Sequence, residues 1–329
     1  MGKMKTGKIP YLHIGIVIVA VAFLIVGGLL LLKKWEENTG RFPEHEIGDP
    51  VIRYEGVEYV LKENVDTFLV LGLDTFEGYV DTDAYNNDKQ ADFIMVIVFD
   101  NDAKTYSAIQ INRDTMVDIN VLGVAGNKVD TVHKQIALAH TYGNGKDLSC
   151  HNTADAVSDL LMGIKINHYV SLTMSAVGTM NDLVGGVEIE VLDDFTDIDP
   201  ALIKGETVLL QGEQALTYVR ARKELDDSSN NARMERQRQY LKALFAAFDK
   251  CAENDESFAV DATLKMGDYM ISDRSATQLQ ALAKKLSEYE FMGVKHMSGE
   301  TVRGEKFMEF YPEEKSIEKM IIELFYVAK

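Results

Sequence analysis

A run of nineteen uncharged residues near the start of the chain constrains its fold more than any other feature. Residues 14–32 contain no charged side chain. As an α-helix with a rise of about 1.5 Å per residue they would span about 28 Å, close to the ~30 Å hydrocarbon core of a bilayer. The run ends in LLLLKKW without a small-residue cleavage site, unlike a secretory signal peptide. We therefore expect an uncleaved transmembrane anchor at residues 14–32, with a buried core helix as the less favoured alternative.

The charges that flank this run predict its orientation. Three lysines precede it within residues 1–13 and have no acidic neighbours, whereas Lys33 and Lys34 are closely followed by two glutamates. The count of positive charges alone does not decide the orientation, because Arg41 adds a third after the run. The pattern favours a cytoplasmic tail at residues 1–13 and a single-pass protein of the cell membrane whose large C-terminal part is extracellular.

The remainder of the chain is strongly acidic. The 329 residues carry a formal net charge of −18, and the first 34 residues contain five lysines and no acid, so 29 basic side chains face 52 acidic ones in the rest. Such a domain repels phosphate backbones, which counts against a general nucleic-acid binder. Cys150 and Cys251 are too few for a disulfide scaffold or a Cys-rich zinc site, and the sequence leaves open whether they form one bridge or two thiols.

The pattern after the anchor predicts a tether followed by one domain. Residues 33–60 are polar and contain prolines and glycines, as a tether does. From residue 61 to 329, short β-branched runs alternate with segments of helical spacing, which predicts one α/β domain with helices on both faces of its sheet. The expected strands are 67–71, 93–99, 105–111 and 187–191, and the expected helices are 152–162, 174–184, 232–248, 275–286 and 314–325.

Two carboxylates lie at the ends of predicted strands. Asp74 follows the apolar run FLVLGL, and Asp92 directly precedes the next strand. Ligands of α/β sheets gather at the carboxyl ends of strands, and a pair of carboxylates suits a hard cation such as Mg²⁺. A turn cap at Asp74 and a strand start at Asp92 are the alternatives from local context.

Basic side chains form the second candidate group. Arg113 and Asp114 follow the strand YSAIQI, and Arg220 and Arg222 lie two residues apart in YVRARKE, a spacing that in extended chain directs both to one side. Four-residue steps back from Leu241 reach two polar residues, Gln237 and Arg233, so these extend the buried stripe of a predicted helix. Because Arg suits phosphate, carboxylates with these arginines predict a metal-assisted phosphate or pyrophosphate site. A solvated basic turn is the alternative.

Six strings in order resemble one known family, the LytR-CpsA-Psr family. The match covers roughly residues 64 to 329, and the strings read FLVLGLD, QADFIMV, IQINRDTMVDI, LVGGVEIEV, LLQGEQALTYVRAR and ARMERQRQYLKAL. The resemblance implies an extracytoplasmic three-layer α/β/α domain with a mixed sheet and an apolar pocket for a polyprenyl chain. It further implies a Mg²⁺-dependent phosphotransferase that moves a glycopolymer from a polyprenyl-pyrophosphate carrier to peptidoglycan.

The same resemblance implies a role for each candidate residue. Asp74 and Asp92 take the carboxylate positions beside the metal. The residues expected to act in catalysis are Asp92, Arg113 and Asp114, and those expected to bind the pyrophosphate are Arg220, Arg222, Arg233 and Gln237. Asp92 is preferred to Asp114 as the general base, since a carboxylate can take the proton of the attacking hydroxyl.

Two positions depart from the family pattern. Gln90 stands where the family commonly has an arginine, and Gln135 stands where it commonly has a lysine. The loss of two cations keeps a second function open, that of a non-catalytic polyprenyl-lipid or glycan-binding partner of an envelope assembly complex. A membrane-bound transcription attenuator is opposed by the acidic domain and the absence of a helix-turn-helix pattern.

Overall fold

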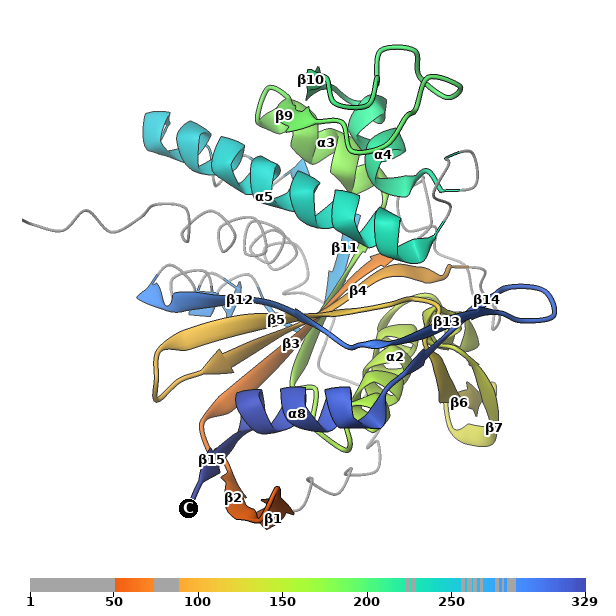
Figure 1. Cartoon of the computed structure of the whole chain (residues 1–329), viewed down its shortest axis with the longest axis vertical. Coiled ribbons are helices and arrows are strands. Elements are labelled where there is room, and N and C mark those ends of the chain that lie inside the picture. The colour runs from red at the N-terminus through yellow and green to blue at the C-terminus, as the bar shows by residue number, and fades with distance from the viewer. Residues whose placement is uncertain are drawn as a thin grey trace, which may run out of the picture.

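The computed structural model describes most of the chain from residue 51 onward (Figure 1). The described residues are 51–73, 89–222, 225, 229–255, 258, 262, 265–266, 269–275, 278–279, 281–282 and 288–329. Within these ranges no helix is both long and apolar enough to cross a membrane. The predicted anchor at residues 14–32 and the predicted metal ligand Asp74 lie outside the described residues.

A mixed six-stranded sheet forms the centre of the domain (Figure 1). Its strands, in spatial order, are β11 (Met270–Ser272), β8 (His168–Thr173), β3 (Val65–Leu73), β4 (Ala91–Asp100), β5 (Thr105–Ile111) and β12 (Glu290–His296). β4 runs antiparallel to both β3 and β5, whereas β8 is parallel to β3 and β12 is parallel to β5. The expected strands 67–71, 93–99 and 105–111 are therefore confirmed and adjacent.

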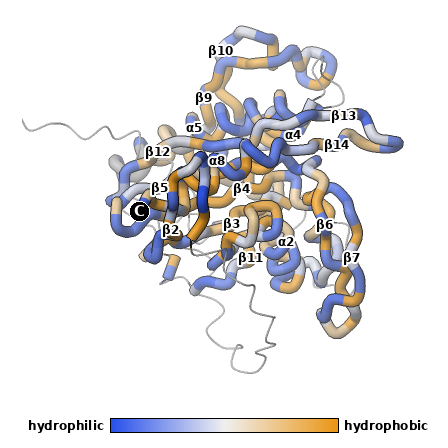
Figure 2. Tube along the Cα trace, turned by 60° about the horizontal axis from the view of Figure 1, so that its bottom comes forward, coloured by the Kyte–Doolittle hydropathy of each residue, from blue (hydrophilic) through white to orange (hydrophobic). Residues whose placement is uncertain are grey.

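Helices cover both faces of this sheet. One face packs against α3 (Ser175–Leu183), α4 (Glu213–Arg220) and α5 (Asn230–Asn254), and the other against α2 (Asp147–Leu160) and α8 (Glu314–Phe325). Alternate residues of each strand point to opposite faces, so Phe68, Ile97 and Phe99 join the first core while Leu69 and Val96 join the second. In Figure 2 hydrophobic segments concentrate along β3 and β4. The structure thus confirms the mixed α/β fold with helices on both faces.

Smaller sheets surround the centre. β1 (Val51–Tyr54), β2 (Val57–Leu61) and β15 (Tyr326–Ala328) form one. Two-stranded sheets pair β6 (Met116–Leu122) with β7 (Lys128–Gln135), β9 (Val187–Glu190) with β10 (Thr207–Leu210), and β13 (Gly299–Arg303) with β14 (Met308–Pro312). A 3₁₀ helix, η1, spans Ile136–Tyr142 and contacts β6 and α2.

One sequence-based expectation about these elements is wrong. The tether does not extend to residue 60, because β2 pairs with β15 at the C-terminus, with Val60 opposite Val327. This error concerns a partner distant in sequence, which local periodicity cannot identify. The expected strand 187–191 is confirmed as β9, which pairs with β10 outside the central sheet.

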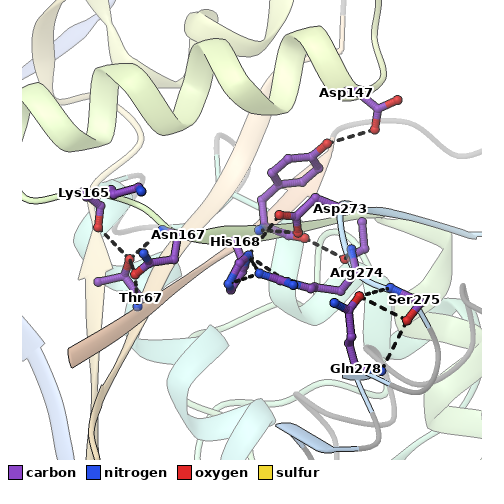
Figure 3. A network of polar contacts seen from close by, with 11 residues as sticks. Thr67, Asp147, Lys165, Asn167, His168, Asp273, Arg274, Ser275 and Gln278 are labelled. Carbon is purple, nitrogen blue, oxygen red and sulfur yellow. Dashed lines mark hydrogen bonds and ion pairs between the residues drawn. The ribbon is translucent and has the colours of Figure 1, made fainter. Parts of the chain in front are cut away.

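A polar network ties the amino-terminal ends of β3 and β8 together (Figure 3). Thr67 Oγ1 donates to the Lys165 carbonyl at 2.7 Å, and the Thr67 amide donates to Asn167 Oδ1 at 2.9 Å. The ring of His168 lies between Asp273, whose Oδ2 is 3.0 Å from Nδ1, and Arg274. These contacts give His168 a structural role at the end of the sheet opposite to the carboxyl ends of β3 and β5.

Candidate functional site

Asp92 lies at a bulge in the central sheet. Gly72 of β3 pairs with Phe93, whereas the next residue, Leu73, pairs with Ala91, so Asp92 is an extra residue on β4. A bulge of this kind redirects the side chain of the extra residue and is common beside active sites. The Asp92 side chain is buried, and the bulge places it at the edge where β3 and β5 end.

Arg113 reaches Asp92 from the neighbouring strand. Ile94 of β4 pairs with Ile111 of β5, so continuing the register by two residues brings positions 92 and 113 opposite each other. The Arg113 Nη1 group donates to Asp92 Oδ1, and its Nη2 group donates to Gln90 Oε1. Arg113 therefore bridges Asp92 and the glutamine that replaces an expected cation.

Asp114 forms the second buried carboxylate of the site. Its Oδ1 accepts a hydrogen bond from Gln135 Nε2 at 2.9 Å, and Arg222 Nη1 lies 3.4 Å from its Oδ2. Burial raises the pKa of the Asp114 carboxyl, although the neighbouring arginines act in the opposite direction. Gln135 also donates to the Met308 carbonyl at 2.7 Å, so the second glutamine substitution is fully engaged in holding Asp114 and β14.

Helix α5 supplies Arg233 and Gln237 from its first two turns. Ser229 caps the helix by accepting a hydrogen bond from the Ala232 amide at 3.1 Å. Arg233 is 4% exposed and its Nη1 lies 3.6 Å from Asp92 Oδ2, while Gln237 Nε2 donates to the Val219 carbonyl at 3.3 Å. The inward direction expected from the four-residue spacing is thus confirmed. Burial lowers the pKa of Arg233 to about 10, which leaves it charged at neutral pH.

The described side chains give the site an excess of positive charge. Two carboxylates, Asp92 and Asp114, face three guanidinium groups, those of Arg113, Arg222 and Arg233. The Nε atoms of Arg113 and Arg233 are buried and have no hydrogen-bond partner among the described residues. Buried donors without partners cost about 1–3 kcal/mol each, so a bound anion that accepts from them would recover this free energy.

An apolar cavity of about 130 Å³ opens beside this cluster. Strands β3, β4 and β8 form its floor and helices α3 and α5 its walls. Phe93 and Gln237 line it: Phe93 directly follows Asp92 in β4, and Gln237 lies one helical turn after Arg233 in α5. The geometry therefore suits an amphiphile with an apolar part and an anionic group.

The two arginines of YVRAR do not occupy equivalent positions. Arg220 is the last residue of α4 and is exposed, whereas Arg222 follows the helix and is partly buried against Asp114. The expectation that an extended segment directs both to one side is wrong, because α4 continues through Arg220. Substrate binding by Arg220 stays a prediction.

Several residues that organise the site were missed in the sequence. Asn112 Oδ1 accepts from the Asp114 amide at 2.9 Å and from Asn230 Nδ2 at 2.6 Å, which joins β5 to the start of α5. Arg236 is fully buried and its Nε donates to the Tyr218 carbonyl at 3.1 Å. The position of Arg236 three residues after Arg233, on the same predicted helix, is the signal that could have found it.

Of the two predicted metal ligands, only Asp92 lies within the described residues. Within the described ranges no three His, Cys, Asp or Glu side chains come together as metal ligands. Both oxygens of Asp92 face guanidinium groups, one of Arg113 and one of Arg233. Asp92 thus offers the carboxylate oxygens that Mg²⁺ prefers, but in this arrangement both oxygens form ion pairs with arginines.

Comparison with known proteins places the chain beside cell-envelope transferases. The family model described as the LytR_cpsA_psr family matches residues 44–324. A relative from Halalkalibacterium halodurans, the polyisoprenyl-teichoic acid–peptidoglycan teichoic acid transferase TagU, is 27% identical over 72% of this chain and 71% of its own length. The TagU of Enterococcus faecalis is 29% identical over 69% and 67%. A solved structure of TagT bound to LI-WTA shares the fold, with a TM-score of 0.57 and 22% identity over 80% of this chain and 90% of that one.

Proposed function

Because the chain belongs to the LytR-CpsA-Psr family, we propose that it moves a glycopolymer from a polyprenyl-pyrophosphate carrier to peptidoglycan. We also propose that the segment at residues 14–32 anchors it in the cell membrane, with its domain outside. The observation that carries the reaction is the apolar cavity that opens beside an excess of buried arginine charge. A polyprenyl pyrophosphate has this division into apolar chain and anionic head.

The donor would bind with its chain in the cavity and its pyrophosphate at the arginines. Gln237 marks the boundary, since it lines the cavity and lies one helical turn after Arg233. Arg113, Arg222 and Arg233 would then exchange part of their contact with Asp92 and Asp114 for phosphate oxygens, which accept bidentate hydrogen bonds from guanidinium groups. The buried Nε atoms of Arg113 and Arg233 supply two further donors.

The transfer step follows from this arrangement. A hydroxyl of the acceptor attacks the phosphorus that carries the glycopolymer, the bond from that phosphorus to the bridging oxygen breaks, and polyprenyl phosphate leaves. Asp92 accepts the proton of the attacking hydroxyl once Arg113 and Arg233 have turned to the phosphate oxygens, whereas Asp114 keeps its hydrogen bond from Gln135. The arginines stabilise the charge that develops on the leaving phosphate, and such reactions depend mainly on positioning and electrostatics.

We propose Mg²⁺ as the cofactor of this transfer. Asp92, together with Asp74, would hold it once the pyrophosphate engages Arg113 and Arg233. When bound, Mg²⁺ would neutralise charge on the phosphate oxygens.

A second function is favoured by Gln90 and Gln135. Both amides occupy positions where the family pattern has cations, and both hydrogen bond to charged residues of the site. A site with fewer cations could retain a polyprenyl lipid or glycan without turning it over, as a non-catalytic partner of an assembly complex would.

Turnover of a labelled polyprenyl-pyrophosphate glycan by the full chain, with peptidoglycan and Mg²⁺, separates these functions. We expect wild type to transfer the label and Asp92→Asn to lose most activity while it retains the fold and the lipid. Asp118→Asn is the control, because Asp118 is an exposed carboxylate on β6 bonded to His133. Lipid binding by wild type without transfer would favour the binding partner, and an active Asp92→Asn variant would remove Asp92 from the reaction.

A further inference from the structure

A polar cleft lies on the opposite flank of α5 from the apolar cavity. It has a volume of about 400 Å³ and lies between β5, the first turns of α5 and the segment from β12 to β14. On α5, Asn231, Met234 and Arg238 line this cleft, whereas Gln237 and Leu241 line the apolar cavity. At about 100° per residue, the side chains that line the cleft lie roughly 100° around the helix from those that line the cavity, so α5 presents a different stripe to each space.

The sheet beneath α5 changes from apolar to polar across one row of paired residues. Met95 of β4 pairs with Gln110 of β5, and Gln110 pairs with His296 of β12. Met95 belongs to the floor of the apolar cavity, and Gln110 and His296 belong to the polar cleft. The two spaces are therefore neighbours on one face of the sheet.

Gln110 gives the cleft a hydrogen-bond donor without a partner. Its side chain is 2% exposed, and its Oε1 accepts from Arg238 Nη1 at 2.6 Å. Since a guanidinium group can only donate, the oxygen of the amide must face Arg238. The buried Nε2 then has no hydrogen-bond partner among the described residues, so a ligand oxygen in the cleft would satisfy it.

The charge of the cleft differs from that of the arginine cluster. Arg238 also forms an ion pair with Glu235, so its positive charge is balanced locally. The other polar groups of the lining are amides and a hydroxyl, with His296 at the rim, while Met234, Met297 and Phe310 supply apolar surface. Amides beside apolar surface suit an uncharged sugar, which has hydroxyl groups at its edge and C–H groups on its faces.

The cleft is connected to the reacting groups through two residues of its lining. Asn112 accepts from the Asp114 amide, and the Phe310 amide donates to the Asp114 carbonyl at 2.9 Å. A ligand in the cleft would therefore lie next to the segment that carries Arg113 and Asp114, on the side away from the lipid cavity.

We propose that this cleft binds the acceptor glycan, an uncharged chain of N-acetylated amino sugars, with Gln110 and Arg238 as ligands. This inference rests on the proposed function and adds a separate place for the second substrate. It predicts that sugar binding and lipid binding respond to different substitutions.

Titration calorimetry with tetra-N-acetylchitotetraose, on the full chain in detergent, tests the proposal. We expect Gln110→Leu and Ser298→Trp to weaken sugar binding by roughly tenfold or more, since the first removes the amide and the second fills the cleft at an exposed position. Glu300→Trp is the matched control, because Glu300 is exposed on β13 and outside the lining. Binding of a polyprenyl pyrophosphate without sugars should be equal in all four proteins.

The possible outcomes distinguish a failure of the glycan-binding cleft from a failure of the proposed transferase function. Lipid binding by wild type without any sugar binding, or equal sugar affinity in the cleft variants, would overturn the cleft and leave the transferase proposal intact. Sugar binding without lipid binding would support the cleft and count against the transferase. If a glycan-bearing donor displaces the chitotetraose and the sugar-free lipid does not, the cleft belongs to the sugars of the donor and the acceptor assignment is wrong.

Discussion

Arg236 is the buried residue whose replacement should reveal how the site is held together. Its guanidinium Nε donates to the Tyr218 carbonyl, Nη2 donates to the Ala221 carbonyl and Nη1 pairs with Asp193. The same group lies over the ring of Phe195, with its carbon 5.5 Å from the ring centroid. Arg236 thus fixes the end of α4, directly before Arg222, against α5.

Replacing Arg236 with Met keeps most of the volume and removes every hydrogen bond. Two carbonyl groups and the carboxylate of Asp193 lose a partner, and breaking a buried ion pair by removing one member costs about 3–5 kcal/mol. In a domain of this size each 1 kcal/mol lowers the melting temperature by about 2–4 °C, so we expect a decrease of roughly 6–20 °C.

Thermal unfolding followed by circular dichroism measures this effect, with Lys242→Met as the control because Lys242 is exposed on the same helix. A melting temperature of Arg236→Met within about 2 °C of wild type would refute the reasoning, because it would assign the buried contacts less than about 1 kcal/mol.

Two further predictions concern binding and pH. Arg222→Ala should weaken binding of polyprenyl pyrophosphate by roughly ten- to a hundredfold, and Arg222→Lys should restore little of it because an ammonium cannot bind in a bidentate manner. Arg220→Ala should have a smaller effect in the same titration. Equal affinities of wild type and Arg222→Ala would reject the assignment of Arg222. Burial lowers the pKa of His140 from 6.5 to about 4, so the unfolded chain takes up this proton first as the pH falls. The free energy of unfolding should therefore decrease by about 3 kcal/mol between pH 7 and pH 4, and urea unfolding of His140→Gln should lack this part of the pH dependence.

The parts of the fold that depend on local pattern could be predicted from the sequence. Gly185 and Gly186 end α3 with positive φ angles of 78° and 103°, as their position after the apolar stripe indicates. The four-residue spacing of Arg233 and Gln237 from Leu241 correctly gave their burial, because helical geometry fixes which residues share a side.

The parts of the fold that depend on partners distant in sequence could not be predicted. The bulge at Asp92 exists only in the pairing of β4 with β3, and no residue type in QADF marks it. The helical state of Arg220 was missed because the two-residue spacing is equally compatible with a strand or a helix end. The hydrogen bond between Gln135 and Asp114 joins β7 to the end of β5, so only the folded chain shows what replaced the expected cation.

The division of one sheet face by α5 has a kinetic consequence. With the proposed donor and acceptor on opposite flanks of the helix, neither has to leave before the other enters, and both can be present when the phosphate group moves. An enzyme of this kind works through a ternary complex, so its double-reciprocal plots intersect, whereas parallel lines would require the protein to hold the glycosyl phosphate covalently after polyprenyl phosphate leaves. With the proposed anchor, the lipid would arrive by lateral diffusion within the bilayer and the glycan from the wall, so their delivery would set the order of arrival.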